Sequence, residues 1–156
     1  MSLDNPKELL VGLLQGNIHV YEDDGSTEVT GVVSAAWFDK DLFKDHGWQV
    51  TVGPTVGASA SVTDLGAHHK KYDEALQVTV WVLEKRGVNY TPERLRFDLI
   101  HEVDRILFKV INDPSDTIDQ VNVSGWVDRD DPENRVLRSD LTVDVEYQKA
   151  RSDIAL

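Results

Sequence analysis

Apolar residues recur at helical spacing over residues 91–111, and this pattern predicts the longest helix of the chain. Thr91 is a suitable N-cap residue, Pro92 suits the first helical position, and the Asn-Asp-Pro sequence at 112–114 would end the helix. A shorter leucine stripe predicts a first helix over about residues 4–16. The two stripes consist of Leu9, Leu10, Leu13 and Leu14, and of Leu95, Leu99, Ile100, Val103, Ile106, Leu107 and Val110.

Alternating apolar and polar residues predict five strands. They cover residues 28–38, 48–52, 76–82, 121–127 and 137–147. The last strand alternates without a break, which places Leu137, Ser139, Leu141, Val143, Val145 and Tyr147 inward. A short loop at 128–134 joins the last two strands, so we expect them to pair antiparallel. The chain is therefore expected to form one α+β domain over residues 1–156, with both helices on one face of a mostly antiparallel sheet.

One stretch between the predicted strands has no clear period. Residues 53–71 read GPTVGASASVTDLGAHHKK and are rich in Gly, Ala, Ser and Thr. Structureless loops of this length are uncommon in compact domains and are usually functional. We expect an extended inserted loop or a flexible hairpin here, long enough to reach a neighbouring molecule.

The composition excludes several classes of protein. Hydrophobic residues make up 40% of the chain, which argues against wholesale disorder. With 16 Lys and Arg against 28 Asp and Glu, the net charge of −12 disfavours binding to nucleic-acid phosphates or to an anionic membrane. The acid excess suits either a well-dispersed surface or adaptation to high salt.

The absence of certain residues and segments narrows the picture further. The chain has no cysteine, which excludes disulfides, thiolate metal sites and cysteine nucleophiles. No apolar run approaches the ~20 residues of a membrane span, and the first ten residues lack the basic start of a signal peptide. We therefore expect a protein that folds in a cytoplasm.

Metal-binding patterns find little support in the sequence. His68 and His69 are adjacent, and in an extended chain their side chains point in opposite directions, which predicts a solvated loop. Two acidic stretches, Asp39-Asp41-Asp45 and Asp128-Asp130-Asp131-Glu133, lack a central Gly and a terminal Glu at the fixed offsets that calcium loops of the EF-hand type require. Both are expected to be ordinary acidic turns, so no metal or other cofactor is predicted.

Catalytic patterns are equally sparse. There is no Gly-rich phosphate loop, no G-x-S-x-G elbow and no H-E-x-x-H sequence. Asp98 and His101 lie on one side of the predicted long helix, where they would form either an acid–base pair or a helix-surface contact. We expect the surface contact, and hence no enzyme.

Two tryptophans do not fit a plain solvent-facing surface. Alternation places Trp81 opposite Val78 and Val80, and Trp126 opposite Val121 and Val123, so both are predicted on the outer face of the sheet. Such a pair indicates either a surface that contacts another protein or a small second core beneath a loop.

The order of elements resembles that of a known family. The segments that carry the resemblance are KELLVGLLQGN, LQVTVWVLEKR, TPERLRFDLIHEVDRILFKV and the final RVLRSDLTVDVEYQK. Together they cover nearly the whole chain, and they are similar to the tail-terminator and tail-completion (head–tail joining) proteins of tailed bacteriophages and archaeal viruses. The likeness is one of pattern, without a diagnostic motif.

The resemblance implies a structural function in the virion. Members of this family form rings, typically hexamers, that cap the tail tube, stop its polymerisation and present a surface to the neck. The implied partners are further copies of the chain, the major tail-tube protein and a neck or connector protein. DNA would pass through the lumen without specific binding, and the ring would be assembled in the host cytoplasm.

A ring needs two different contact patches on each subunit. All eight arginines lie in the second half of the chain, where they would meet acids of a neighbour. The interface candidates are Arg94, Arg96, Arg105, Arg135 and Arg138, together with Trp81, Trp126, His68 and His69. The alternatives are a neck or tail-tube protein, a non-viral α+β binding module and, least favoured, a small hydrolase built around His101.

Overall fold

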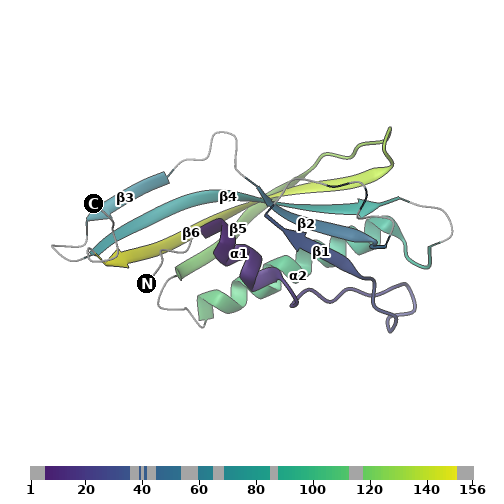
Figure 1. The fold of residues 1–156 in the computed structure, drawn as a ribbon, viewed down its shortest axis with the longest axis horizontal. Helices are drawn as coiled ribbons and strands as arrows, with labels where there is room; N and C mark the ends of the chain where they lie inside the picture. The colour runs from purple at the N-terminus through teal and green to yellow at the C-terminus, as the bar shows by residue number, and fades with distance from the viewer. Residues whose placement is uncertain are drawn as a thin grey trace.

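The computed structural model describes residues 6–35, 39, 41, 45–53, 60–64, 69–84, 88–112 and 118–150. In these ranges the chain forms two helices and six strands (Figure 1). They follow in the order α1 (Pro6–Leu14), β1 (Gly31–Ser34), β2 (Trp48–Gly53), β3 (Ala60–Asp64), β4 (His69–Leu83), α2 (Pro92–Asn112), β5 (Ile118–Asp128) and β6 (Val136–Ala150). The predicted α+β class and the long second helix are thereby confirmed.

The strands form a single sheet in the order β1-β2-β4-β6-β5, and β3 pairs with β4 beyond the end of β2. Every pairing is antiparallel except that of β1 with β2. β4 and β6 are paired over their full length, from His69 opposite Ala150 to Leu83 opposite Val136. The ends of β4 and β6 beside β3 project beyond the helices (Figure 1).

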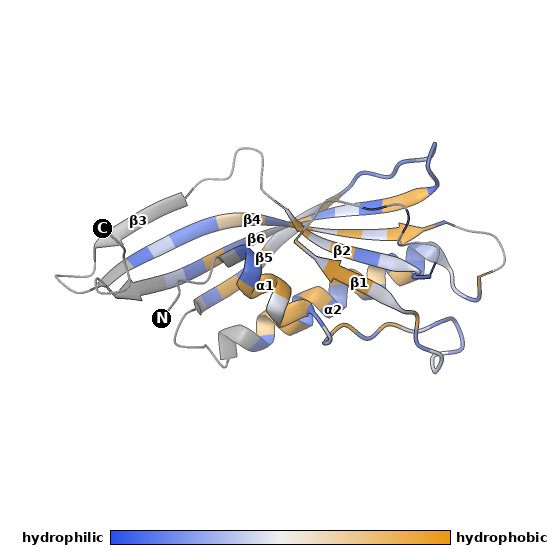
Figure 2. Ribbon diagram, in the orientation of Figure 1, coloured by the Kyte–Doolittle hydropathy of each residue, from blue (hydrophilic) through white to orange (hydrophobic). Residues whose placement is uncertain are grey.

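Both helices pack on the same face of the sheet, as expected. The hydrophobic positions along α1, α2 and the strands that they cover are visible in Figure 2. The inward residues of β6 are buried as predicted, including Ser139. Apolar residues with no exposed surface come from both helices and from β2, β4, β5 and β6: Leu10, Leu14, Leu95, Leu99, Val103, Leu107, Val50, Val52, Val78, Val80, Val82, Val121, Leu141, Val143 and Val145.

The predicted strand at 28–38 is shorter in the structure. β1 spans only Gly31–Ser34, while Glu28 forms an isolated antiparallel bridge with Tyr21. The amide of Val29 donates to the carbonyl of Val20, 2.9 Å away. The chain therefore folds back on itself before β1 begins, and residues 36–38 lie outside the described residues.

The stretch 53–71 is not entirely a loop. Ala60–Asp64 form β3, which pairs antiparallel with the start of β4. Residues 54–59 and 65–68 lie outside the described residues. Small and β-branched residues such as those at 60–64 fit a pleated strand once a neighbour supplies the ladder, and the long β4 supplies it here.

The turn at residues 22–27 is hydrogen-bonded to the N-terminal end of α2. The carboxylate of Asp23 accepts hydrogen bonds from the amide and the hydroxyl of Thr91 and from Nε of Arg94. Thr91 thus occupies the predicted cap position, yet its hydroxyl donates to Asp23. The hydrogen bond from the Thr91 amide, aided by Arg94, lowers the pKa of Asp23. This contact joins positions 68 residues apart in the sequence.

Asp24 holds the same turn together. Its carboxylate accepts hydrogen bonds from the hydroxyl and amide of Thr27, at 2.6 and 2.9 Å, and from the amide of Ser26. Gly25 completes the turn with a φ of +76°, a conformation that side chains rarely adopt. The hydrogen bonds from Thr27 lower the pKa of Asp24 from 3.8 to about 2.

We predict that Asp24→Asn flattens the acid side of the stability profile. Because the pKa is 3.8 when unfolded and about 2 when folded, the carboxylate stabilises the fold above pH 3.8, and this contribution is lost as the pH falls through 2. Urea unfolding followed by tryptophan fluorescence between pH 2 and 6 measures the effect. Asp104→Asn, which removes an acid from the exposed face of α2, is the control. Identical slopes for the wild type and Asp24→Asn would contradict this account of the turn.

Candidate functional site

The face of the sheet opposite the helices is partly covered by the chain itself. Gln49 and Thr51 on β2 and Thr79 on β4 are buried although they point away from the helices. The amide of Asp39 donates to Oε1 of Gln49, at 3.1 Å. Asp39, which lies between β1 and β2 in the sequence, therefore contacts this outer face, where polar groups are buried that alternation alone would leave in water.

Trp81 belongs to a small second core on the outer face. It is only 5% exposed and packs with Val136 and Leu83. Its indole N–H donates to Oγ1 of Thr51, 3.0 Å away, and the guanidinium of Arg138 lies 4.9 Å from the centre of its ring. The outer-face position is confirmed, and of the two interpretations of Trp81, a partner contact or a small second core, its burial favours the second core.

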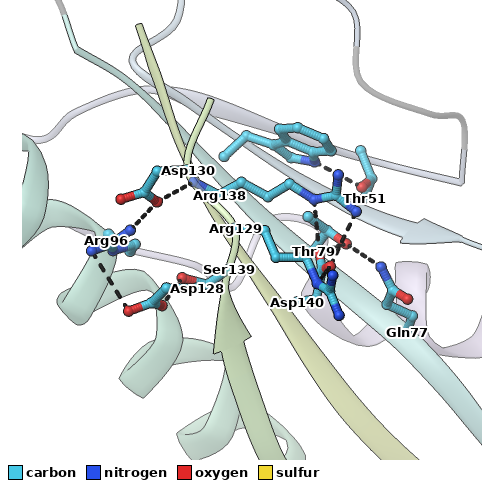
Figure 3. A network of polar contacts seen from close by, with 11 residues as sticks. Thr51, Gln77, Thr79, Arg96, Asp128, Arg129, Asp130, Arg138, Ser139 and Asp140 are labelled. Carbon is cyan, nitrogen blue, oxygen red and sulfur yellow. Dashed lines mark hydrogen bonds and ion pairs between the residues drawn. The ribbon is translucent and has the colours of Figure 1, made fainter. Parts of the chain in front are cut away.

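An ion network surrounds this second core (Figure 3). The carboxylate of Asp140, whose side chain is 12% exposed, accepts hydrogen bonds from Nε and Nη2 of Arg138, at 2.9 and 3.1 Å. The hydroxyl of Thr79 donates to the same carboxylate at 3.0 Å, and Nε of Arg129 lies 3.1 Å from it. Two guanidinium groups thus share one acid, and the network stabilises the fold through partners within the chain.

Most predicted interface arginines bind carboxylates of their own chain. Arg94 pairs with Asp23 and Asp98, Arg96 with Asp128 and Asp130, Arg105 with Glu102, and Arg138 with Asp140. The Arg96 pairs tie α2 to the loop between β5 and β6 (Figure 3). Arg135 lies exposed in that loop with a φ of 53°. His68 lies outside the described residues, as does the side chain of His69, the first residue of β4.

Trp126 lies on the opposite face from the one predicted. The register between β5 and β6 shifts between Val123 and Gly125, so Ser124 is an extra residue in β5. After this bulge Trp126 pairs with Leu141, a core residue, and therefore shares the face of the helices. Asp128 confirms the new alternation, because its carboxylate meets both the buried Ser139 and Arg96 of α2. A glycine inside a strand is a signal of such a bulge.

Trp126 is 49% exposed at the edge of the sheet, and Val127 beside it is 54% exposed. β5 has only one described neighbour, β6, so its other edge carries backbone groups that no described strand pairs with. We call this surface the β5 edge, consisting of residues 124–128. Large apolar side chains next to an open strand edge favour association with another chain.

An open groove of about 350 Å³ lies at the other end of the sheet, beside β1. We call it the β1 groove. It is lined by residues of the segment that follows α1, between Gln15 and His19, by residues 28–33 and by Trp48. His19 Nδ1 lies 2.8 Å from Oε1 of Glu28 at its rim. No local pattern in the sequence predicts this groove, because it lies where the chain coming from α1 reaches the edge of β1.

The remaining candidates for chemistry are engaged in other contacts. Asp98 pairs with Arg94, and the His101 ring packs against Phe97, with 4.2 Å between ring centres. Within the described residues, no three His, Cys, Asp or Glu side chains gather where they could hold a metal ion. In the same part of the chain, no helix has both the length and the apolarity needed to cross a membrane.

Comparison of the sequence with protein-family models and with curated proteins gives no match. The two sheet edges and the order of the elements are therefore the features of this chain that bear on its function.

We predict that Gly31→Ala destabilises the fold. A β-carbon at Gly31 would lie 1.9 Å from the buried ring of Trp48, so the ring or the strand must shift. Overpacking of this kind costs about 1–3 kcal/mol. Gly125→Ala is the matched control, since a β-carbon there meets nothing within 4 Å. Chemical denaturation of both variants measures the difference, and equal stabilities would contradict the close packing of Gly31 against Trp48.

We also predict that Asp140→Ala destabilises the protein by about 2 kcal/mol or more, because it leaves two guanidinium groups without their shared acid. Asp144→Ala removes an exposed acid from the same face of the same strand and should change the stability little. The ratio of the two effects, measured by urea unfolding, tests the network. Equal effects would mean that the network contributes nothing specific.

Proposed function

We propose that this chain is a structural virion protein that forms a closed ring, as a hexamer, on the end of a tail tube. The ring terminates tube polymerisation and joins the tail to a neck or connector protein. The observation that carries the proposal is the pair of open edges on one sheet, the β5 edge and the β1 groove, at opposite ends of the strand order.

Two unlike edges favour head-to-tail association. When two different patches of a subunit meet, each added copy leaves one patch of each kind free, and the series ends only when it closes into a ring. An isologous dimer would instead require one patch that complements itself. The likeness to tail-terminator proteins and the two unlike edges therefore support the same kind of assembly.

The charge of the chain is compatible with the passage of DNA. The net charge is −12, and exposed acids such as Asp73 and Asp144 lie on the outer face of the sheet. A surface rich in acids repels phosphates, so DNA would move past it without binding. In this proposal the partners are other copies, the tail-tube protein and the neck protein, in a virion assembled in the host cytoplasm. The chain acts without a cofactor or a catalytic residue.

The contacts inside the subunit change the choice of interface residues. Arg94, Arg96, Arg105 and Arg138 already serve the fold through their own acids. Arg135 is exposed at the tip of the β5–β6 loop and remains the arginine best placed to meet a neighbour. Arg138 is unsuited to a test of assembly, because its charge reversal would disturb Asp140 and Trp81.

We predict that light scattering after size exclusion detects a species of about 105 kDa, six times 17.5 kDa. The measurement is made in low and in molar salt, since a ring seen only in molar salt would indicate adaptation to a saline host. Arg135→Glu should lower the assembled fraction, and Lys109→Glu, which makes the same charge change at the end of α2, should not. A monomer in both salts would contradict the free ring and favour an α+β binding module.

A further inference from the structure

Opposite edges of the sheet carry features that complement each other. We propose that the β1 groove of one copy receives the β5 edge of the next copy, with the Trp126 ring seated beside Gly31 and Trp48. The inference rests on the proposed ring and identifies the contact that closes it. Four observations support this contact. They are the position of the groove, the face and exposure of Trp126, the directions of the two strands, and the charged residues beside the groove and the β5 edge.

The edge of β1 is prepared for another strand. Val20 and Tyr21 already pair antiparallel with Val29 and Glu28, so a ladder on this side of β1 has been started. The chain then leaves the edge toward α1, and no described strand lies beside β1 on that side. An incoming strand would continue the ladder from Thr30 onward, where the groove opens.

The groove and the tryptophan lie on the same side of the sheet. Val33 and Trp48, which line the groove, belong to the core on the helix side. Trp126 faces the helix side because of the bulge at Ser124. Gly31 has no side chain, so the buried Trp48 ring packs closely over it and forms one wall of the groove, whose volume of about 350 Å³ admits an aromatic ring. Without the bulge, Trp126 would face away from the groove.

The strand directions also agree. β1 runs parallel to β2, and each of the steps from β2 to β4, β4 to β6 and β6 to β5 is antiparallel. β5 therefore runs opposite to β1. Copies related by rotation about an axis along the strands keep these directions, so β5 of one copy would pair with β1 of the next in the antiparallel sense.

The two rims offer one pair of opposite charges. Glu28, beside His19, is half-exposed at the groove, and Arg129, which follows the β5 edge and lies 3.1 Å from Asp140, is mostly exposed. Their attraction would favour a second copy over an unrelated acidic strand and offset part of the repulsion between chains of charge −12. Since every copy supplies both rims, the occupant of the groove is another copy of this chain.

Cysteine cross-linking tests the contact directly, because the chain has no cysteine of its own. Val32 pairs with Gln49 and Val127 with Asp140, so both side chains lie on the outer face of the sheet, one at each edge. A mixture of Val32→Cys and Val127→Cys, treated with a short bismaleimide in the salt that favours assembly, should give a cross-linked species of about 35 kDa, twice 17.5 kDa. Neither variant alone should cross-link, and the double variant should give a ladder that ends at the size of the ring.

Truncation of the tryptophan provides the second measurement. Trp126→Ala should raise the concentration at which half of the protein assembles by at least tenfold, as truncation of a buried aromatic anchor does. Phe108→Ala removes a side chain that is 60% exposed near the end of α2, about three turns beyond Arg96, which contacts Asp128, and it should assemble like the wild type. Near-UV circular dichroism confirms that both variants remain folded.

The outcomes separate this contact from the ring itself. A ring that gives no 32–127 cross-link, or that ignores Trp126→Ala, overturns the contact and leaves the ring proposal standing. Cross-linking of either single variant with itself indicates an isologous pair and also overturns it. A ladder of open-ended length supports the contact and contradicts closure. A monomeric wild type without cross-links in the mixture, in low and in molar salt, overturns both.

Discussion

The antiparallel pairing of β4 with β6 is the constraint on which the rest of the molecule depends. Over its full length this ladder places alternate residues of both strands on two faces. Val78, Val80 and Val82 face the same side as Leu141 and Val143, and α2 covers this side. β2 and β3 attach along one edge of the pair, and β5 attaches along the other. A slip by one residue would expose the whole core face at once.

On the outer face of the same ladder, polar and charged side chains are held by hydrogen bonds and ion pairs. Thr79, Arg138 and Asp140 cannot turn toward the core, and the hydroxyl of Thr79 donates to the carboxylate of Asp140 on the outer face. Buried polar groups must find partners, and here they find them both across strands, as Thr79 does with Asp140, and along one strand, as Arg138 does with Asp140. The polar face is thus structural near Trp81 and solvated toward the far end of β4, where Asp73 and Asp144 are exposed.

Much of the fold could be predicted from the sequence, because local periodicity reports burial. The spacing of Leu95, Leu99 and Val103 predicted α2, and the alternation from Leu137 to Tyr147 predicted the inward side of β6. The candidate site was less accessible. Burial of Trp81 depends on contacts with residues from other strands, such as Val136 and Thr51, and the β1 groove depends on where the chain runs from α1 to a strand edge. Neither the burial of Trp81 nor the groove produces a periodic pattern of apolar residues in the sequence. Most of the arginines chosen by charge alone proved to have acids of their own chain as partners.

The bulge in β5 is the case in which counting residues along a strand misleads. Alternation assigns sides by parity, and Ser124 changes the parity of every residue that follows it in β5. The register of β4 with β6 is not affected by the extra residue, because that residue lies in the edge strand β5. Insertion or loss of a single residue near position 124 would therefore move an exposed indole from one side of the sheet to the other while the core stays the same. A single inserted or deleted codon could therefore create or remove a contact between this edge and another chain while the fold stays the same.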